Sequence, residues 1–195
     1  MGQYYTPVLI DEETNDEKKY SSHDYGNGLK LMEHSYLGNT FVETICNEIV
    51  EHPMRVAWVG DYADEVVDED KYKNIPNIER FIEIEKDITN VKMPYAQPNA
   101  VPQNVSSLCY FIINHTKKEF INMYEYVFTN KTNIHPLPLL TSIGNGCGGG
   151  DYCGKCKELC GNWCGDVIEC NYYHNIVNII KEYKDITMAL KFKEY

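Results

Sequence analysis

The chain has 195 residues, a mass of 22.6 kDa and a formal net charge of −11, because 29 acidic side chains outnumber 18 lysines and arginines. Apolar residues make up 43% of the chain and aromatic residues 12%, which is enough for a hydrophobic core and excludes a wholly disordered protein. Only Arg55 and Arg80 are arginines, so the composition argues against direct binding of nucleic acid and favours a partner with a basic surface. The length predicts a single domain over residues 1–195.

The N-terminal sequence lacks the basic and apolar regions of a secretory signal. No run of about 18 apolar residues occurs elsewhere, so we expect no membrane-spanning segment. Residues 1–6 fit the Met-Gly-x-x-x-Ser/Thr pattern of N-myristoylation, but the apolar residues that follow favour a strand over 2–10.

In chain order, the first part of the sequence predicts a β-hairpin, a helix and a further strand. The apolar spacing over 39–51 is helical, with Asn39 or Thr40 as the N-cap and Pro53 beyond the end. The expected elements are strands at 2–10 and 19–22 around an acidic turn at 11–17, a helix at 39–51 and a strand at 55–59.

Residues 61–87 carry over half of the net charge, with ten acidic and four basic side chains. The apolar spacing over 75–87 predicts a short amphipathic helix. A charge run of this kind is usually a solvated face, but it is also suited to contact a basic protein surface. The candidate partner-binding residues are Asp61, Asp64, Glu65, Asp68, Glu69 and Asp70.

The second half of the sequence predicts further strands and a C-terminal helix. Residues 108–114 are apolar almost throughout, which is typical of an interior strand, and a tight turn leads from them to a partner strand at 119–121. Residues 124–128 fit either a helix or a strand. The other expected elements are an extended proline-containing loop at 93–104, extended chain at 135–140, a strand at 166–173 and a helix at 176–192.

Helices and strands alternate without the rhythm of strand–helix–strand units. We therefore predict an α+β fold, with a mainly antiparallel sheet, two or three helices and a loop rich in cysteine and glycine.

Six of the eight cysteines lie within 24 residues, whereas Cys46 and Cys109 stand alone in apolar stretches typical of buried free thiols. The Cys-x2-Cys pair at 153 and 156 has the short spacing of a zinc knuckle, so we expect a zinc ion to stabilise residues 144–174. An iron–sulfur cluster or a loop of reduced cysteines remains an alternative. The candidate zinc ligands are Cys147, Cys153, Cys156, Cys160, Cys164, Cys170 and His174.

An Asp-Tyr pair occurs three times at the end of an apolar stretch, and such loops often carry ligand-binding side chains. The aspartates are equally suited to cap turns. The glycine-rich residues 144–150 are a second candidate ligand loop, because free backbone N–H groups can hold a phosphate. The alternative ligand pocket comprises Asp24, Asp61, Asp151 and His115.

Two short patterns agree in order with those of metallophosphoesterases, namely Gly-Asp-x-x-Asp at 60–64 and Asn-His at 114–115. A two-metal hydrolase needs further ligands that the sequence does not supply.

Several longer blocks, which cover most of the chain, resemble one family of small proteins encoded by phages and prophages of gut bacteria. The family has no settled activity, so the resemblance assigns no catalytic residue. The blocks are MGQYYTPVLIDE, DYGNGLKLMEHSYLGN, VAWVGDYAD, INHTKKEF, HPLPLLT, GNGxGGGDY and GNWCGDVIE.

The resemblance implies a phage accessory protein in the cytoplasm of the infected bacterium. Together with the acidic composition, it predicts a non-enzymatic protein that binds and inhibits a host protein with a basic surface, such as a CRISPR effector. The alternatives are a nucleotide-binding or small-ligand-binding protein, a metal-dependent hydrolase that uses the Asp-Tyr and glycine-rich loops, and a structural module stabilised by zinc.

Overall fold

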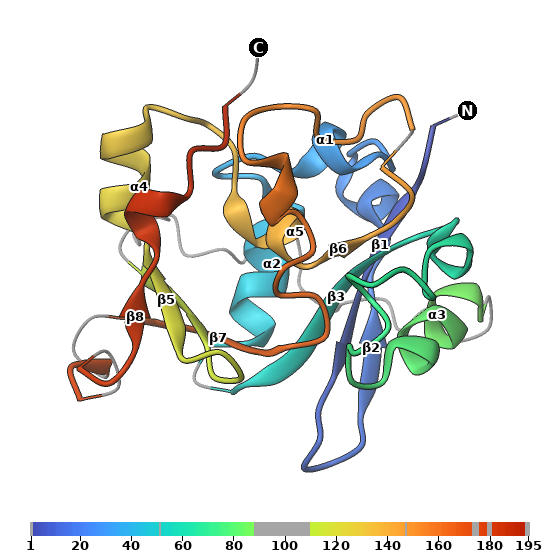
Figure 1. The fold of residues 1–195 in the computed structure, drawn as a ribbon, viewed down its shortest axis with the longest axis horizontal. Coiled ribbons are helices and arrows are strands. Elements are labelled where there is room, and N and C mark those ends of the chain that lie inside the picture. The colour runs from blue at the N-terminus through green and yellow to red at the C-terminus, as the bar shows by residue number, and fades with distance from the viewer. Residues whose placement is uncertain are drawn as a thin grey trace.

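The computed structural model describes residues 2–50, 52–87, 110–146, 148–172, 176–178 and 181–193. These residues form one sheet with the strand order β2-β1-β3-β7-β4-β5-β8, and β6 pairs with β3 (Figure 1). Every pairing is antiparallel except β3 with β6 and β5 with β8. The prediction of an α+β fold with a mainly antiparallel sheet is confirmed, and the described residues contain five α-helices rather than two or three.

The described strands and helices are short; three 3₁₀ turns lie between them and a fourth follows β8. The strands are β1 (Tyr5–Ile10), β2 (Glu17–Lys19), β3 (Met54–Gly60), β4 (Tyr110–Asn114), β5 (Glu119–Asn122), β6 (Ser142–Ile143), β7 (Val167–Tyr172) and β8 (Lys184–Asp185). The helices are α1 (Leu31–His34), α2 (Thr40–Glu48), α3 (Ile78–Lys86), α4 (Met123–Asn130) and α5 (Pro136–Leu140).

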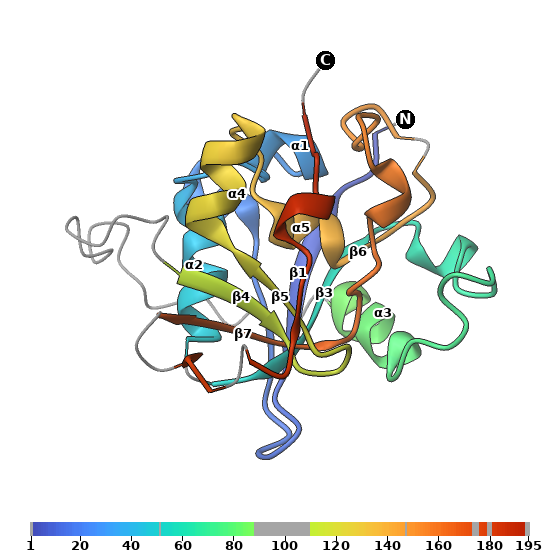
Figure 2. The same cartoon turned by 60° about the vertical axis from the view of Figure 1, so that its left-hand side comes forward.

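Alternate side chains of the strands enter separate apolar clusters on the two faces of the sheet. On β3, Val56 and Trp58 join the larger cluster with α1, α2, α4 and α5, whereas Ala57 and Val59 pack with α3. Figure 2 shows α2 and α4 on one side of the sheet and α3 on the other. A third, smaller cluster on β4 and β5 includes Phe111 and Phe120.

The sheet consists of two staggered halves joined by β3 and β7. These two strands share only two residue pairs, Met54 with Ile168 and Arg55 with Val167. The Arg55 side chain crosses the joint and donates from Nη1 to the Gly165 carbonyl at 2.8 Å. Helix α2 spans the same joint, because the Cys170 N–H on β7 donates to the Ile49 carbonyl just after α2.

The predicted hairpins and the first helix are confirmed, with the first hairpin at β1–β2 and the second at β4–β5. The bounds of the first return strand are wrong, because β2 is Glu17–Lys19 rather than 19–22. Asn39 is the N-cap of α2, where its Oδ1 accepts from the Phe41 N–H at 2.9 Å. The prediction of extended chain at 135–140 is wrong. Pro136 and Pro138 lie in the first turn of α5, where no backbone N–H is needed, and the His135 side chain accepts from the Leu137 N–H.

The prediction of a helix over 176–192 is wrong for its described residues 181–192, which form β8 and a 3₁₀ turn at Thr187–Ala189. The Asp185 carboxylate accepts from the Thr187 N–H at 2.8 Å, and the Thr187 hydroxyl accepts from the Asn122 N–H. These bonds hold the chain against β5 instead of allowing a helical turn. The loop predicted at 93–104 lies outside the described residues.

The glycine-rich loop at 144–150 packs over Gln3, just before β1. Gln3 is 1% exposed, and its Oε1 accepts from the Tyr5 hydroxyl at 2.9 Å. A Cβ at Gly144 would lie 2.4 Å from Gln3 Oε1, and one at Gly148 would lie 2.6 Å from the Gln3 nitrogen. The absence of side chains here therefore allows close packing of the loop on Gln3, and these two glycines do not present an open phosphate cradle.

We expect Gly144→Ala to lower the free energy of unfolding by about 1–3 kcal/mol, because the added methyl group overpacks the Gln3 site. Gly149→Ala is the matched control, since its Cβ would meet nothing within 4 Å and its φ is not left-handed. It should change stability by less than about 0.5 kcal/mol. Urea unfolding of both variants checks this, and equal effects would contradict the packing role.

Candidate functional sites

The acidic segment forms an exposed surface beyond the end of β3. Asp64 pairs with Lys86 at 2.7 Å and Asp70 with Lys73 at 2.6 Å. The exposed carboxylates of Glu65, Asp68 and Glu69 have no ion pair among the described residues. Asp61 is held differently, because its Oδ1 accepts from the Tyr4 N–H at 3.1 Å. The structure therefore places all six predicted partner-binding residues in one segment and leaves five of them exposed.

Negative charge is crowded where this segment meets α3. Burial raises the pKa of the Glu85 carboxyl above its usual range, and the neighbouring Asp61 and Asp64 carboxylates add to the rise. Lys19 and Lys86 oppose it. An added cation at this surface would be attracted by all three carboxylates.

The four residues of the alternative ligand pocket do not meet at one point. Asp61 and Asp151 both lie at the start of β1, where Asp61 contacts Tyr4 and the Asp151 carboxylate is beside Tyr5. Asp24 is exposed on the 3₁₀ turn at Ser22–Tyr25. His115 follows β4 and its N–H donates to the Val167 carbonyl, at the opposite end of β3.

This register also separates the two metallophosphoesterase-like patterns. Val167 pairs with Arg55, and Asp61 lies six residues farther along the chain from Arg55. At the rise of an extended strand, that places Asp61 roughly 20 Å from the level of His115. Two metal ions about 4 Å apart cannot be shared across this span.

The described cysteines are distributed over different parts of the molecule. Cys153 is exposed, Cys164 is buried in the cluster with α3, and Cys170 is buried beside Cys46 in the larger cluster. In the described part of the chain, no group of three or more His, Cys, Asp or Glu side chains is placed to hold a metal ion. Cys147 and His174 lie outside the described residues, so the zinc site remains a prediction.

Burial also sets the chemistry of these thiols. It raises the pKa of the Cys160 thiol to about 12, and it raises that of Cys164 further. The pKa of Cys170 is also well above its usual range, first through burial and then through Cys46. Thiols of this kind stay protonated at neutral pH and react slowly.

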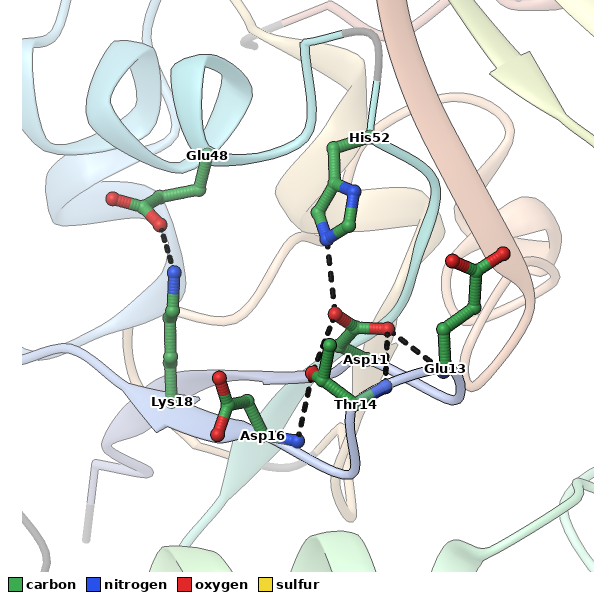
Figure 3. Close-up of polar contacts among 7 residues, drawn as sticks. All are labelled: Asp11, Glu13, Thr14, Asp16, Lys18, Glu48 and His52. Carbon is green, nitrogen blue, oxygen red and sulfur yellow. Dashed lines mark hydrogen bonds and ion pairs between the residues drawn. The ribbon is translucent and has the colours of Figure 1, made fainter.

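Sequence reasoning missed a pocket of about 320 Å³ at the base of the β1–β2 hairpin. Asp11 directly follows β1, and four donors surround its carboxylate (Figure 3). Oδ1 accepts from the Glu13 N–H at 2.8 Å and the Thr14 N–H at 3.3 Å, and Oδ2 accepts from the Thr14 hydroxyl at 2.7 Å and His52 Nε2 at 3.0 Å. The pocket is lined by Asp11, Glu12, Glu13, His52, Pro53, Arg55 and Val167.

The half-exposed imidazole of His52 lies at the pocket and is hydrogen-bonded to the Asp11 carboxylate. Since a carboxylate only accepts, His52 donates from Nε2 and its ring is aligned by Asp11. The nearby Arg55 is already paired with Glu12 at 2.6 Å. Such a site can bind a small polar group, and the only local sequence signal is an aspartate followed by threonine three residues later in a turn.

Comparison of the chain with protein-family models, with curated proteins and with solved structures finds no match. Among the described residues, no helix is long and apolar enough to cross a membrane.

We expect the Asp11 carboxyl to titrate with a pKa of about 2, chiefly because the Thr14 hydroxyl donates to its charged form. A depressed folded-state pKa stabilises the fold above about pH 4, and this contribution is lost as the pH falls towards 2. Carboxyl ¹³C NMR measures it directly. Thr14→Val should raise the pKa, whereas Glu13→Gln keeps the donating backbone N–H and should not. Equal titration in both variants would contradict the assigned cause.

Among the described cysteines, we expect Cys153 to react first with iodoacetamide in the native protein, and Cys164 and Cys170 to react only on unfolding. Mass spectrometry of peptides after timed labelling gives the order. Early labelling of Cys164 would contradict its burial. Protection of Cys153 that a chelator removes would instead support the predicted zinc site.

Proposed function

We propose that this protein binds a partner with a basic surface through the exposed acidic segment Asp61–Asp70. The carrying observation is the set of three exposed carboxylates, Glu65, Asp68 and Glu69, that have no ion pair among the described residues. Exposed unpaired charge raises association rates and selects partners of the opposite sign. Crowding of Glu85, Asp61 and Asp64 adds to the attraction for a cationic surface.

We further propose that the partner is a host protein that handles nucleic acid, and that the chain is a phage accessory protein acting in the cytoplasm of the infected bacterium. Defence nucleases such as CRISPR effectors hold nucleic acid in positively charged channels. An acidic surface that occupies such a channel excludes the nucleic acid by competition for the same charges. The resemblance of the sequence blocks to phage and prophage proteins supports this choice of partner.

The alternative of a nucleotide-binding or small-ligand-binding protein, or of a metal-dependent hydrolase, receives less support at its predicted residues. Asp61 and Asp151 lie far from His115 along the sheet, and the glycine-rich loop is packed on Gln3. The hairpin pocket at Asp11 and His52 is the better place to look for a small polar ligand.

Removal of three charges tests the docking surface. The variant Glu65→Gln, Asp68→Asn, Glu69→Gln should retain about tenfold less partner from nuclease-treated bacterial lysate, since exposed ion pairs contribute about 0.2–1 kcal/mol each. The matched control is Asp24→Asn, Glu125→Gln, Glu158→Gln, which neutralises the same residue types at exposed positions outside the segment. Quantitative mass spectrometry of the retained proteins is the measurement.

Proteins retained equally by both variants would overturn the docking surface. If the partner is lost only from the first variant but has no role in nucleic-acid handling, the docking surface is supported and the proposed class of partner is overturned. If that partner is a nuclease, its activity in the presence of the two variants tests inhibition directly.

A further inference from the structure

A buried glutamate lies on the polar face of β7. Successive residues of this strand alternate, so that Ile168 and Cys170 enter the larger cluster while Glu169 and Asn171 point to the opposite face. Glu169 is 5% exposed, and Asn171 Nδ2 donates to its Oε1 at 2.6 Å. A buried carboxylate needs partners of this kind to remain charged.

The second oxygen of Glu169 is occupied by His115. The distance from His115 Nε2 to Glu169 Oε2 is 2.6 Å, and the His115 backbone N–H donates to the Val167 carbonyl at 2.9 Å. On its other side, His115 Nδ1 lies 3.0 Å from the Tyr183 hydroxyl, and the two rings meet edge to face. The side chains thus form a continuous chain from carboxylate to imidazole to phenol.

The donors and acceptors in this chain have a defined order. Because an ionised carboxylate only accepts, the neutral imidazole carries its proton on Nε2 and presents the lone pair of Nδ1 to the phenol. The Tyr183 hydroxyl then donates to Nδ1 and keeps its oxygen lone pairs available. This order is that of a nucleophile hydrogen-bonded to a base that a third group orients.

The surroundings disfavour a preformed phenolate. Burial raises the pKa of Tyr183, and the Glu169 and Glu182 carboxylates raise it further. Reaction at this oxygen therefore requires the proton to leave during attack. The same two carboxylates repel anionic reagents, so an uncharged electrophile suits the site better than a phosphate.

We propose that Glu169, His115 and Tyr183 form a site at which Tyr183 is the nucleophile, His115 the general base and Glu169 the positioning residue, and that its substrates are uncharged esters. In the step, the Tyr183 oxygen attacks the ester carbonyl, and the phenolic proton passes to His115 Nδ1. The imidazolium then returns this proton to the leaving oxygen as the carbon–oxygen bond of the ester breaks. The alcohol or phenol leaves, and the acyl group remains on Tyr183 as an aryl ester. The site is independent of the acidic docking surface.

The proposal is tested by incubating the 195-residue protein with p-nitrophenyl acetate as the ester. Release of p-nitrophenol should accompany acetylation of the peptide that contains Tyr183. Tyr4 and Tyr124 serve as internal comparators, because they are 48% and 54% exposed and have no histidine contact among the described residues. We expect Tyr183 to be acetylated at least about 100-fold faster than either, within the range that general base catalysis contributes.

Three variants separate the roles. Tyr183→Phe should abolish the fast phase, and His115→Asn should reduce acetylation of Tyr183 to the rate of the comparators. Glu169→Gln keeps an acceptor for the imidazole without the charge, so we expect an intermediate rate. Thermal unfolding of each variant shows whether the fold is retained, and added imidazole should restore acetylation of Tyr183 in a folded His115→Ala variant.

The pH dependence of Tyr183 acetylation distinguishes a catalytic role of His115 from a purely structural one. Among the described residues, Glu169 pairs with His115, and Glu182 acts on Tyr183. Two further ion pairs, Lys117 with Asp166 and Lys184 with Glu119, lie on the neighbouring elements. With His115 as the base, acetylation of Tyr183 should not depend on the phenolate and should rise by less than tenfold per pH unit up to pH 10. Ordinary tyrosines react through the phenolate, with a rate that keeps rising towards pH 10.

Acetylation of Tyr183 at the rate of Tyr4 and Tyr124 would overturn the proposal. A fast reaction that survives His115→Asn, or a rate that rises tenfold per pH unit up to pH 10, would equally overturn the role of His115. Loss of thermal stability in the variants without any change in the Tyr183 rate would show that the three side chains only anchor the C-terminal segment.

Discussion

The two halves of the sheet depend on one short joint, where β3 and β7 share only two residue pairs. Further contacts therefore support the joint. Backbone hydrogen bonds cross it beside the paired strands, such as that from the Gly165 N–H to the Val56 carbonyl at 2.9 Å, and side chains add to them. Trp58 of β3 and Ile168 of β7 are both fully buried in the same apolar cluster, under helix α2. Arg55 adds a charged hydrogen bond across the joint to the Gly165 carbonyl.

The stagger at this joint also explains where the polar side chains gather. Strands that begin or end there leave backbone groups and buried polar atoms that need partners. Asn114, at the end of β4, donates to Asp166 at 2.7 Å, and Lys117 pairs with the same carboxylate at 3.1 Å. Val167 follows Asp166 directly; it lines the hairpin pocket, and its carbonyl accepts from the N–H of His115 in the Glu169–His115–Tyr183 chain.

The elements that could be predicted from the sequence are those whose local residue pattern determines their secondary structure. The apolar residues of β1 and β3, the alternation of β7 and the helical spacing of α2 are local patterns, and burial in the core stabilises the elements they predict. Helix α5 and the C-terminal turn differ from the predictions because each depends on a single hydrogen bond that a side chain, His135 or Asp185, accepts from a backbone N–H. Residue propensities do not include such bonds. The close packing of the glycine-rich loop on Gln3 could not be predicted, because Gln3 lies more than 140 residues away in the sequence.

The candidate sites show the same limit. The acidic segment could be predicted because charge is counted directly in the sequence. Neither histidine–carboxylate pair could be predicted, since 41 residues separate His52 from Asp11 and 54 separate His115 from Glu169. The sheet brings these partners together, and it also holds the acidic segment about 20 Å from His115. At that separation, which exceeds the screening length of physiological salt, substitutions in the two regions should act additively. A binding role for one and a chemical role for the other are therefore compatible in a single small domain.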